Sequence, residues 1–268
     1  MDIKDSRKCN IFNLNALARY FEVNPEDCLS IYMELLQDSD FINQINNEVE
    51  HVKKTWGFNK GIFSRQTITS VDWFAFERIL IYVLIRIRRP DRILETGVYY
   101  GGNTVFALKA LERNGHGFLV SIDFPDAKIR KTAAASQRHP LVGDSEFYQE
   151  HLDPGFIIPR SLKKRWQLIE GDSLEEIPRL ADRFDLYIHD SDHSMTFLSR
   201  ELGLAEEKLT PDSVMVVDDI DWSNAFYQFC VNRKLWPLLL TDNGKDDLRV
   251  RTGVVYRKHP RNGDNSFT

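Results

Sequence analysis

The stretch Arg92-Ile93-Leu94-Glu95-Thr96-Gly97-Val98-Tyr99-Tyr100-Gly101-Gly102-Asn103-Thr104 decides the fold. A short apolar run ends in the acid Glu95, a glycine-bearing turn follows, and Asn103 or Thr104 can cap the next helix. This is the strand–loop–helix layout of a nucleotide pocket. A dinucleotide fold requires G-x-G-x-x-G. Here Tyr99 replaces the middle glycine, and a carboxylate at the strand end would repel a pyrophosphate. The pattern favours a ligand with a cationic amine and no phosphate.

The string L-E-T-G-V-Y-Y-G-G-N-T, from Leu94 to Thr104, resembles the first motif of the class I S-adenosylmethionine (SAM)-dependent methyltransferases. It is especially similar to that of the catechol and caffeoyl-CoA O-methyltransferases. The resemblance covers about residues 70 to 258. It implies a doubly wound, mostly parallel, seven-stranded α/β sheet and assigns SAM binding to Glu95, Gly97, Tyr99 and Gly101. The alternative is an ordinary βα turn in which the glycines only relieve backbone strain.

Composition narrows the class of protein. The chain has 268 residues, 42% hydrophobic and 28% charged, which is typical of a globular protein with one large α/β domain. A net charge of −5 argues against nucleic acid as a partner. No signal peptide is visible, and the most apolar run, Ile79–Ile87, is too short to cross a bilayer. Three cysteines without C-x-x-C spacing indicate a reducing compartment. We therefore expect a cytoplasmic protein without a membrane partner; a homo-oligomer stays open.

Two regions are predicted. Residues 1–70 carry apolar residues at helical spacing and form an N-terminal helical extension or lid, and residues 71–268 form the SAM-binding domain. From Arg92, β and α signals alternate, which predicts a mostly parallel sheet. By the resemblance, the seventh strand runs antiparallel beside the sixth. Predicted strands are 92–95, 117–122, 166–170, 185–189, 213–217, 235–240 and 252–257; predicted helices are 13–21, 25–36, 41–54, 72–88, 104–113, 127–137, 173–180, 194–208 and 224–233.

Two further strand ends carry candidate SAM contacts. Asp123 ends the second strand and can accept two hydrogen bonds from a ribose diol, a role that the resemblance also gives it; a helix cap is the alternative. After the third strand, Gly171 lets the backbone approach a flat ligand, and Asp172 can accept from an exocyclic amine. Similar methyltransferases place adenine at this turn, which includes Ser173. Asp172 or Ser173 is also a good helix start, and both interpretations can hold together.

Acidic residues also end the fourth and fifth strands, at Asp190, Asp218 and Asp219. Because ligands of open α/β sheets gather at the carboxyl ends of the strands, these acids are expected to converge beside the SAM site. Their mutual repulsion is costly unless a cation lies among them, and oxygen ligands suit magnesium or another hard divalent cation. The catechol-type enzymes bind a divalent metal with two aspartates and an asparagine at matching positions. Here Asp219 replaces the asparagine, as in the macrolide-sugar O-methyltransferases. Acids that only end strands or cap helices are the alternative.

His193 lies three residues after Asp190, where the catechol-type enzymes carry a lysine assigned as general base. An imidazole titrates near neutral pH and could accept the proton of a hydroxyl group as its oxygen is methylated. The alternative is a histidine that caps the helix beginning at Ser194. His189 points to the other face of its strand and is expected to be structural.

Together, the residues and the resemblance predict methyl transfer from SAM to a hydroxyl oxygen of a small molecule, assisted by a divalent cation. Asp190 and His193 are the catalytic candidates, and Asp190 is also expected to contact SAM. Two other functions stay open: a metal-independent N- or O-methyltransferase, and a SAM- or nucleotide-binding protein without turnover. A relative of the same fold that performs oxidation is a further alternative.

Overall fold

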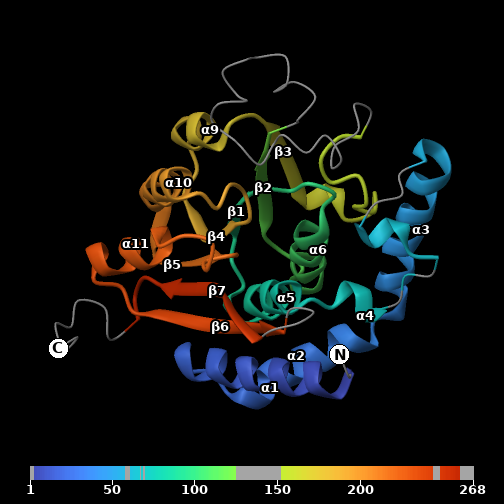
Figure 1. Cartoon of the computed structure of the whole chain (residues 1–268), viewed down its shortest axis with the longest axis horizontal. Helices are drawn as coiled ribbons and strands as arrows, with labels where there is room; N and C mark the ends of the chain where they lie inside the picture. The colour runs from blue at the N-terminus through green and yellow to red at the C-terminus, as the bar shows by residue number, and fades with distance from the viewer. Residues whose placement is uncertain are drawn as a thin grey trace.

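A seven-stranded sheet with strand order β3-β2-β1-β4-β5-β7-β6 forms the centre of the molecule (Figure 1). The computed structural model describes residues 3–57, 61–66, 68, 70–124, 152–243 and 248–259. The strands are β1 (Arg92–Thr96), β2 (Phe118–Asp123), β3 (Trp166–Glu170), β4 (Phe184–His189), β5 (Leu209–Val217), β6 (Pro237–Asn243) and β7 (Leu248–Tyr256).

The pairing of the strands confirms the predicted class I methyltransferase fold. β1 pairs in parallel with both β2 and β4, β2 with β3, and β4 with β5. β7 lies between β5 and β6 and is antiparallel to both. Strand order reverses at β1, so the carboxyl ends of β1 and β4 flank a crevice of the kind that binds ligands in open α/β sheets.

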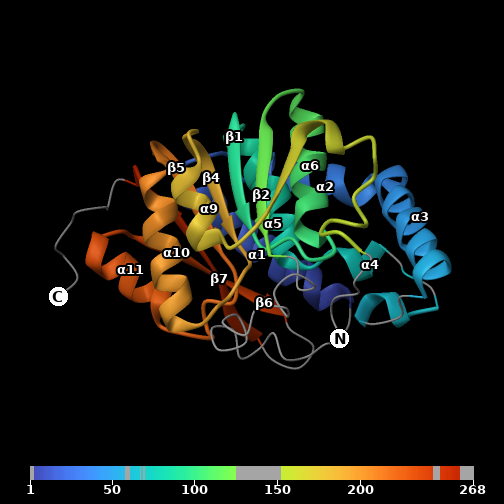
Figure 2. The ribbon, with the colours of Figure 1, turned by 90° about the horizontal axis from the view of Figure 1, so that it is seen from above.

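Helices cover both faces of the sheet (Figures 1 and 2). One face carries α9 (Ser173–Arg179), α10 (Met195–Glu207) and α11 (Ala225–Arg233), and the other carries α5 (Phe76–Arg88) and α6 (Gly102–Asn114). Each face has its own hydrophobic cluster, because strands buried on both sides alternate their apolar side chains between two layers. Leu94 and Tyr187 face α10, whereas Ile93 and Ile188 face the α5 and α6 layer.

The N-terminal region folds as three longer helices, α1 (Ile3–Tyr20), α2 (Pro25–Gln37) and α3 (Ser39–Trp56), followed by η1 (Gly61–Ser64) and α4 (Ser70–Trp73). Their buried side chains belong to the same hydrophobic cluster as α5 and α6. The side chain of Asn13 donates to the carbonyl of Thr241 (2.6 Å), and Tyr20 donates to the carbonyl of Trp236 (2.6 Å), so α1 lies along β6. The N-terminal helices therefore pack on the α5 and α6 side of the sheet. The boundary between a helical extension and a SAM-binding domain at residue 71 stays a prediction.

One predicted helix is wrong as a continuous element. Residues 72–88 form two helices, because the chain between α4 and α5 is extended at Ala75 (φ −61°, ψ 145°). Tertiary contacts explain the break. The indole of Trp73 donates to the Asn46 side chain (2.8 Å), and the Trp73 carbonyl accepts from Arg78 (3.2 Å). The predicted helix 127–137 lies outside the described residues.

Other predicted elements differ at their ends. β5 begins four residues before the predicted start, α1 begins ten residues earlier than predicted, and β6 begins two residues later. Within the described part of the chain, none of the helices combines the length and the apolar character needed to cross a bilayer.

Candidate active site

The glycine turn after β1 is held against the β4 strand end. Gly97 has φ +83°, and a β-carbon there would lie 1.8 Å from the backbone oxygen of Asp190. Its amide donates to the carbonyl of Ile122 (3.0 Å), and the Asp190 amide donates to the carbonyl of Thr96 (2.8 Å). Only glycine fits this position. The contact fixes the predicted SAM loop beside the first acidic residue of the site.

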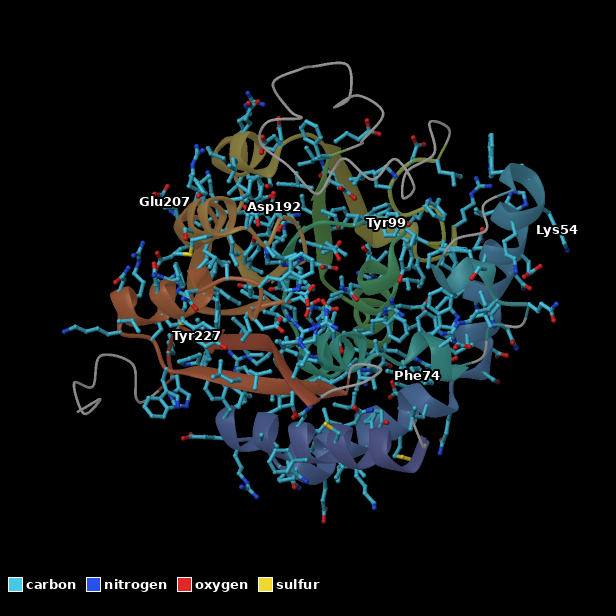
Figure 3. All side chains as sticks on the ribbon, viewed as in Figure 1. Lys54, Phe74, Tyr99, Asp192, Glu207 and Tyr227 are labelled. Carbon is cyan, nitrogen blue, oxygen red and sulfur yellow. The ribbon has the colours of Figure 1, made fainter. Side chains whose placement is uncertain are left out.

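The rest of the loop is strained and leads into α6. Tyr99 has φ +49° and Gly101 has φ +97°, and Gly101 occupies the N-cap position of α6. A β-carbon at Gly101 would lie 2.8 Å from the Ile158 side chain. The Tyr99 ring is edge-on to the Tyr100 ring at 4.8 Å. Figure 3 labels Tyr99 in this loop and Asp192 in the loop after β4. Strain of this kind gathers at functional loops.

The carboxylate of Glu95 is not exposed at the glycine loop, where it could contact a ligand directly. It is fully buried, and its carboxylate accepts from the Thr104 hydroxyl (3.0 Å to each oxygen) and from the Ser121 hydroxyl (2.5 Å). Burial raises the pKa of Glu95 to about 7, although these two hydroxyl groups oppose the rise. The side chain thus joins β1 to β2 and α6 beneath the loop.

Asp123 is bound to the same loop. One carboxylate oxygen accepts from the amides of Val98 (3.0 Å) and Tyr99 (2.6 Å), and the other accepts from the Phe124 amide (2.7 Å). Burial raises the pKa of Asp123 to about 6, against the effect of the three amides. Asp123, the residue predicted to bind the ribose, therefore lies at the glycine loop, and its carboxylate fixes the backbone of that loop.

The turn after β3 confirms the helix-start interpretation. Asp172 is the N-cap of α9, and its side chain accepts from the Leu174 amide (2.9 Å). Gly171 donates its amide to the carbonyl of Asp123 (2.9 Å), so this turn adjoins the second strand end. Ser173 is buried and donates to the carboxylate of Glu201. The Ser173 side chain thus contacts α10.

Three carboxylates converge at the crevice: Asp190, Asp218 and Glu77, a residue that the sequence analysis missed. One oxygen from each lies within 4.8 Å of the others. Burial, followed by mutual repulsion, raises the pKa of Glu77 and of Asp190 well above the ordinary range. Burial and Asp219 raise the pKa of Asp218 to about 6. Asn103 donates to both Glu77 (2.6 Å) and Asp190 (2.9 Å). All groups in this cluster offer oxygen ligands, which fits a hard divalent cation.

Asp219 stands apart from this cluster. It adopts φ +48°, and its carboxylate pairs with the guanidinium of Arg251, with Nε at 2.7 Å. Its other oxygen lies 3.9 Å from Nε2 of His193. Of the three predicted metal ligands, the structure brings Asp190 and Asp218 together and turns Asp219 toward β7.

His193 lies between the strand-end acids. Its Nε2 is 3.9 Å from both Asp190 and Asp219, and its ring contacts the exposed indole of Trp222 at a centroid distance of 5.5 Å. Burial, followed by the neighbouring His189, lowers the pKa of His193 to about 4. The imidazole is therefore neutral at pH 7, but it titrates well below the near-neutral range that the sequence analysis assumed. The side chain of Ser194, the N-cap of α10, forms no cap hydrogen bond.

His189 is fully buried, as expected for a structural residue. Its Nδ1 lies 2.5 Å from the carboxylate of Glu201 on α10.

The sequence signals for Glu77 and Glu201, which were not among the predicted site residues, were weak. Glu77 is one acid at the start of an apolar helix, and Glu201 is one of several acids on an amphipathic helix, so spacing alone could not select them.

The comparisons with known proteins agree with this geometry. Residues 94–220 match the family described as a methyltransferase domain. The O-methyltransferase hkm8 of Aspergillus hancockii is 26% identical over 152 residues, which is 57% of this chain and 51% of that protein. The match thus spans about half of the length of this curated relative.

Solved structures share the fold. The O-methyltransferase from Bacillus cereus in complex with S-adenosylhomocysteine has a TM-score of 0.52 at 14% identity, over 80% of this chain and 90% of that chain. The O-methyltransferase TomG from Streptomyces achromogenes, involved in tomaymycin synthesis and solved with SAM, has a TM-score of 0.50 at 17% identity, over 80% and 89%. The sheet order and the matched segment agree: this chain has the class I methyltransferase fold, and its residues 94–220 match the methyltransferase domain family.

Proposed function

We propose that the protein transfers the methyl group of SAM to a hydroxyl oxygen of a small molecule. The observation that carries this proposal is the close contact of Gly97 with Asp190, because it joins the SAM loop to the acidic crevice. A methyl donor and an acceptor held on either side of this contact would react with little loss of freedom. The similar proteins named above are O-methyltransferases, and one is solved with SAM.

SAM is proposed to bind over the carboxyl ends of β1, β2 and β3. Gly97, Tyr99 and Gly101 supply the loop, Asp123 accepts from the ribose hydroxyls, and the turn of Gly171, Asp172 and Ser173 borders adenine. Because Glu95 is buried and already accepts from Thr104 and Ser121, it supports the loop from below. Asp190 lies at the border between the SAM loop and the crevice.

Glu77, Asp190 and Asp218 would hold a divalent cation such as magnesium. Their oxygens are close together and repel one another, so a cation among them would relieve a cost that the fold otherwise bears. A bound magnesium ion would act as a Lewis acid toward the acceptor hydroxyl group. Asp219 is proposed to balance Arg251 instead of binding the ion directly.

His193 is proposed as the general base. Its ring is neutral at pH 7 and lies beside Asp190 and Asp219, next to the exposed face of Trp222. In this position Nε2 can accept the hydroxyl proton while the acceptor oxygen is methylated. The indole of Trp222, which is 54% exposed, gives a flat apolar wall that an aromatic acceptor or a sugar ring could cover.

A metal-independent O-methyltransferase is the second candidate, and Asn103 favours it. The Asn103 amide already donates to two of the three carboxylates, and Arg78 on the same side of the crevice lowers the pKa of both. These groups could hold the acids in place without an ion. The two candidates differ in their response to chelation.

Calorimetry with SAM, S-adenosylhomocysteine and NAD tests the ligand class. We expect micromolar binding of the first two and none of NAD, and the reverse pattern would refute the proposal. Incubation with SAM and a panel of catechols, flavonoids and sugars, followed by mass spectrometry for S-adenosylhomocysteine, then tests turnover. The same incubation in EDTA should abolish product if the cation is required, and full activity in EDTA would establish the metal-independent candidate.

A further inference from the structure

A single buried carboxylate connects three loops of the proposed active site. Glu201 on α10 is fully buried and accepts hydrogen bonds from Thr96 (3.2 Å), Ser191 (2.9 Å) and Tyr187 (3.0 Å). It also contacts Nδ1 of His189 at 2.5 Å and accepts from Ser173. These donors come from β1, the first residue of α9, β4 and the loop after β4, whereas the acceptor comes from one helix.

Three of the four hydroxyl donors are adjacent in sequence to a proposed site residue, and so is His189, which precedes Asp190. Thr96 precedes Gly97 of the SAM loop, Ser173 follows the adenine-side Asp172, and Ser191 follows Asp190. A hydroxyl group that is fixed by a hydrogen bond also fixes its own backbone. The Glu201 carboxylate therefore constrains the backbone of each loop within one or two residues of a proposed site residue.

The carboxylate is ionised in this site. Burial alone would raise the pKa of Glu201, but His189 and the hydroxyl donors outweigh burial and hold it below the ordinary value. A buried charge with this many donors is rigid, because breaking any one bond leaves part of the charge unpaired. His189 extends the network, since its ring stands edge-on to the ring of His193 at a centroid distance of 5.3 Å.

We propose that Glu201 is a positioning residue that holds the loops of Gly97, Asp172 and Asp190 in the arrangement that binds SAM, an inference that rests on the proposed function. Glu201 touches none of the reacting groups. Its effect is to keep the three loops in register before the ligand arrives, so that binding does not have to order them. The same network fixes the His189 ring against which His193 lies.

The substitution Glu201→Gln tests this proposal, because it keeps the shape of the side chain but removes the charge and presents an N–H group to several donors. We expect the Kd for S-adenosylhomocysteine, measured by calorimetry, to rise at least about tenfold, the scale for hydrogen bonds to a charged group. Hydrogen exchange should become faster at residues 96–101, 171–173 and 190–194. Glu207→Gln, an exposed position at the end of the same helix, is the matched control and should change neither quantity.

Ser191→Ala and Thr96→Val each remove one donor and keep the charge, and each should raise the Kd about two- to tenfold. They decide the question if Glu201→Gln does not fold. A Glu201→Gln variant with a lower melting temperature but an unchanged Kd would show a purely structural role and overturn the inference, as would unchanged Kd values in both single-donor variants. If the wild-type protein itself fails to bind S-adenosylhomocysteine, the proposed function is wrong, which is a distinct result.

Discussion

The guanidinium of Arg251 on β7 pairs with the carboxylate of Asp219 after β5. This ion pair divides two adjacent aspartates between two tasks. Asp218 points to Glu77 and Asp190, whereas Asp219 neutralises Arg251 on the antiparallel strand β7. Asp219 has a left-handed backbone conformation (φ +48°), and its side chain points away from that of Asp218. The proposed cation site thus takes its third carboxylate from α5, across the crevice.

The two aspartates should therefore differ in their effect on metal binding. Magnesium added to the wild-type protein should raise its melting temperature, because an ion that binds only the folded state stabilises it. Asp218→Asn should abolish this rise, and Asp219→Asn should retain most of it. Glu77→Gln should behave like Asp218→Asn. Differential scanning fluorimetry across a magnesium titration measures all four proteins. Equal loss in both aspartate variants would restore Asp219 as a ligand.

Gly97 gives a second prediction, on stability. Gly97→Ala must adopt a left-handed conformation and also bring its β-carbon to 1.8 Å from the Asp190 oxygen. We expect the free energy of unfolding to fall by about 2–5 kcal/mol, the sum of the left-handed cost and overpacking. Gly115→Ala is the control, because it has φ +76° and no atom within 4 Å of the added carbon. It should cost about 1–2 kcal/mol. Urea denaturation measures both, and similar losses would show that the loop is not tightly held.

Local sequence signals were enough to predict the sheet and its strand-end residues. The strand from Arg92 to Glu95 and the turn chemistry of Gly97 and Gly101 are encoded over a few residues, and parallel strands bring their ends to one edge. Asp123, Asp190 and Asp218 were placed at this edge for that reason, and the structure has them there, whereas their roles stay predictions. The resemblance to the SAM-dependent methyltransferases rests on the same residues, and the sheet order and the matched segment confirm it.

The partners of these residues could not be predicted in the same way. Glu77, Arg251 and Glu201 lie far along the chain from the groups they contact, and neither spacing nor composition indicates which side chains meet. The break between α4 and α5 was missed because it depends on Asn46 binding Trp73, a tertiary contact that overrides helical spacing. The orientation of Glu95, buried beneath its loop, also follows from packing.

His193 should affect turnover far more than cofactor binding. His193→Ala removes the only proposed proton acceptor, and the rate of methyl transfer should fall about 10²–10⁴-fold. The Kd for S-adenosylhomocysteine should change little, because the His193 ring lies beside Asp219 and Trp222, which are not among the proposed SAM contacts. Product formation with the best acceptor of the panel, together with calorimetry, measures both quantities. Wild-type turnover combined with a lower melting temperature would establish His193 as a packing residue.

The last prediction concerns Asp38, which connects the N-terminal helices to α6. Its carboxylate caps α3 at the Phe41 amide (3.0 Å) and contacts Arg113 (2.6 Å) and Lys109 (3.3 Å) on α6. Burial alone would raise the pKa of Asp38, but the bond from Arg113, the cap and Lys109 hold it below the ordinary value. Its stabilising effect is therefore present above the unfolded pKa of about 3.9 and is lost as pH falls through the lower folded pKa.

Asp38→Asn keeps an amide oxygen that can cap α3 and removes only the charge. At pH 7 we expect this variant to lose about 1–3 kcal/mol of unfolding free energy, the scale for hydrogen bonds to a charged group. Below about pH 4 the difference in unfolding free energy between the variant and the wild-type protein should shrink, because Asp38 of the wild-type protein also becomes neutral when it is protonated. Asp40→Asn, at an exposed position in the first turn of the same helix, is the control. Urea denaturation at pH 7 and pH 3 measures the three proteins. A difference that stays constant between the two pH values would mean that the charge of Asp38, and therefore its ionic contact with α6, does not stabilise the protein.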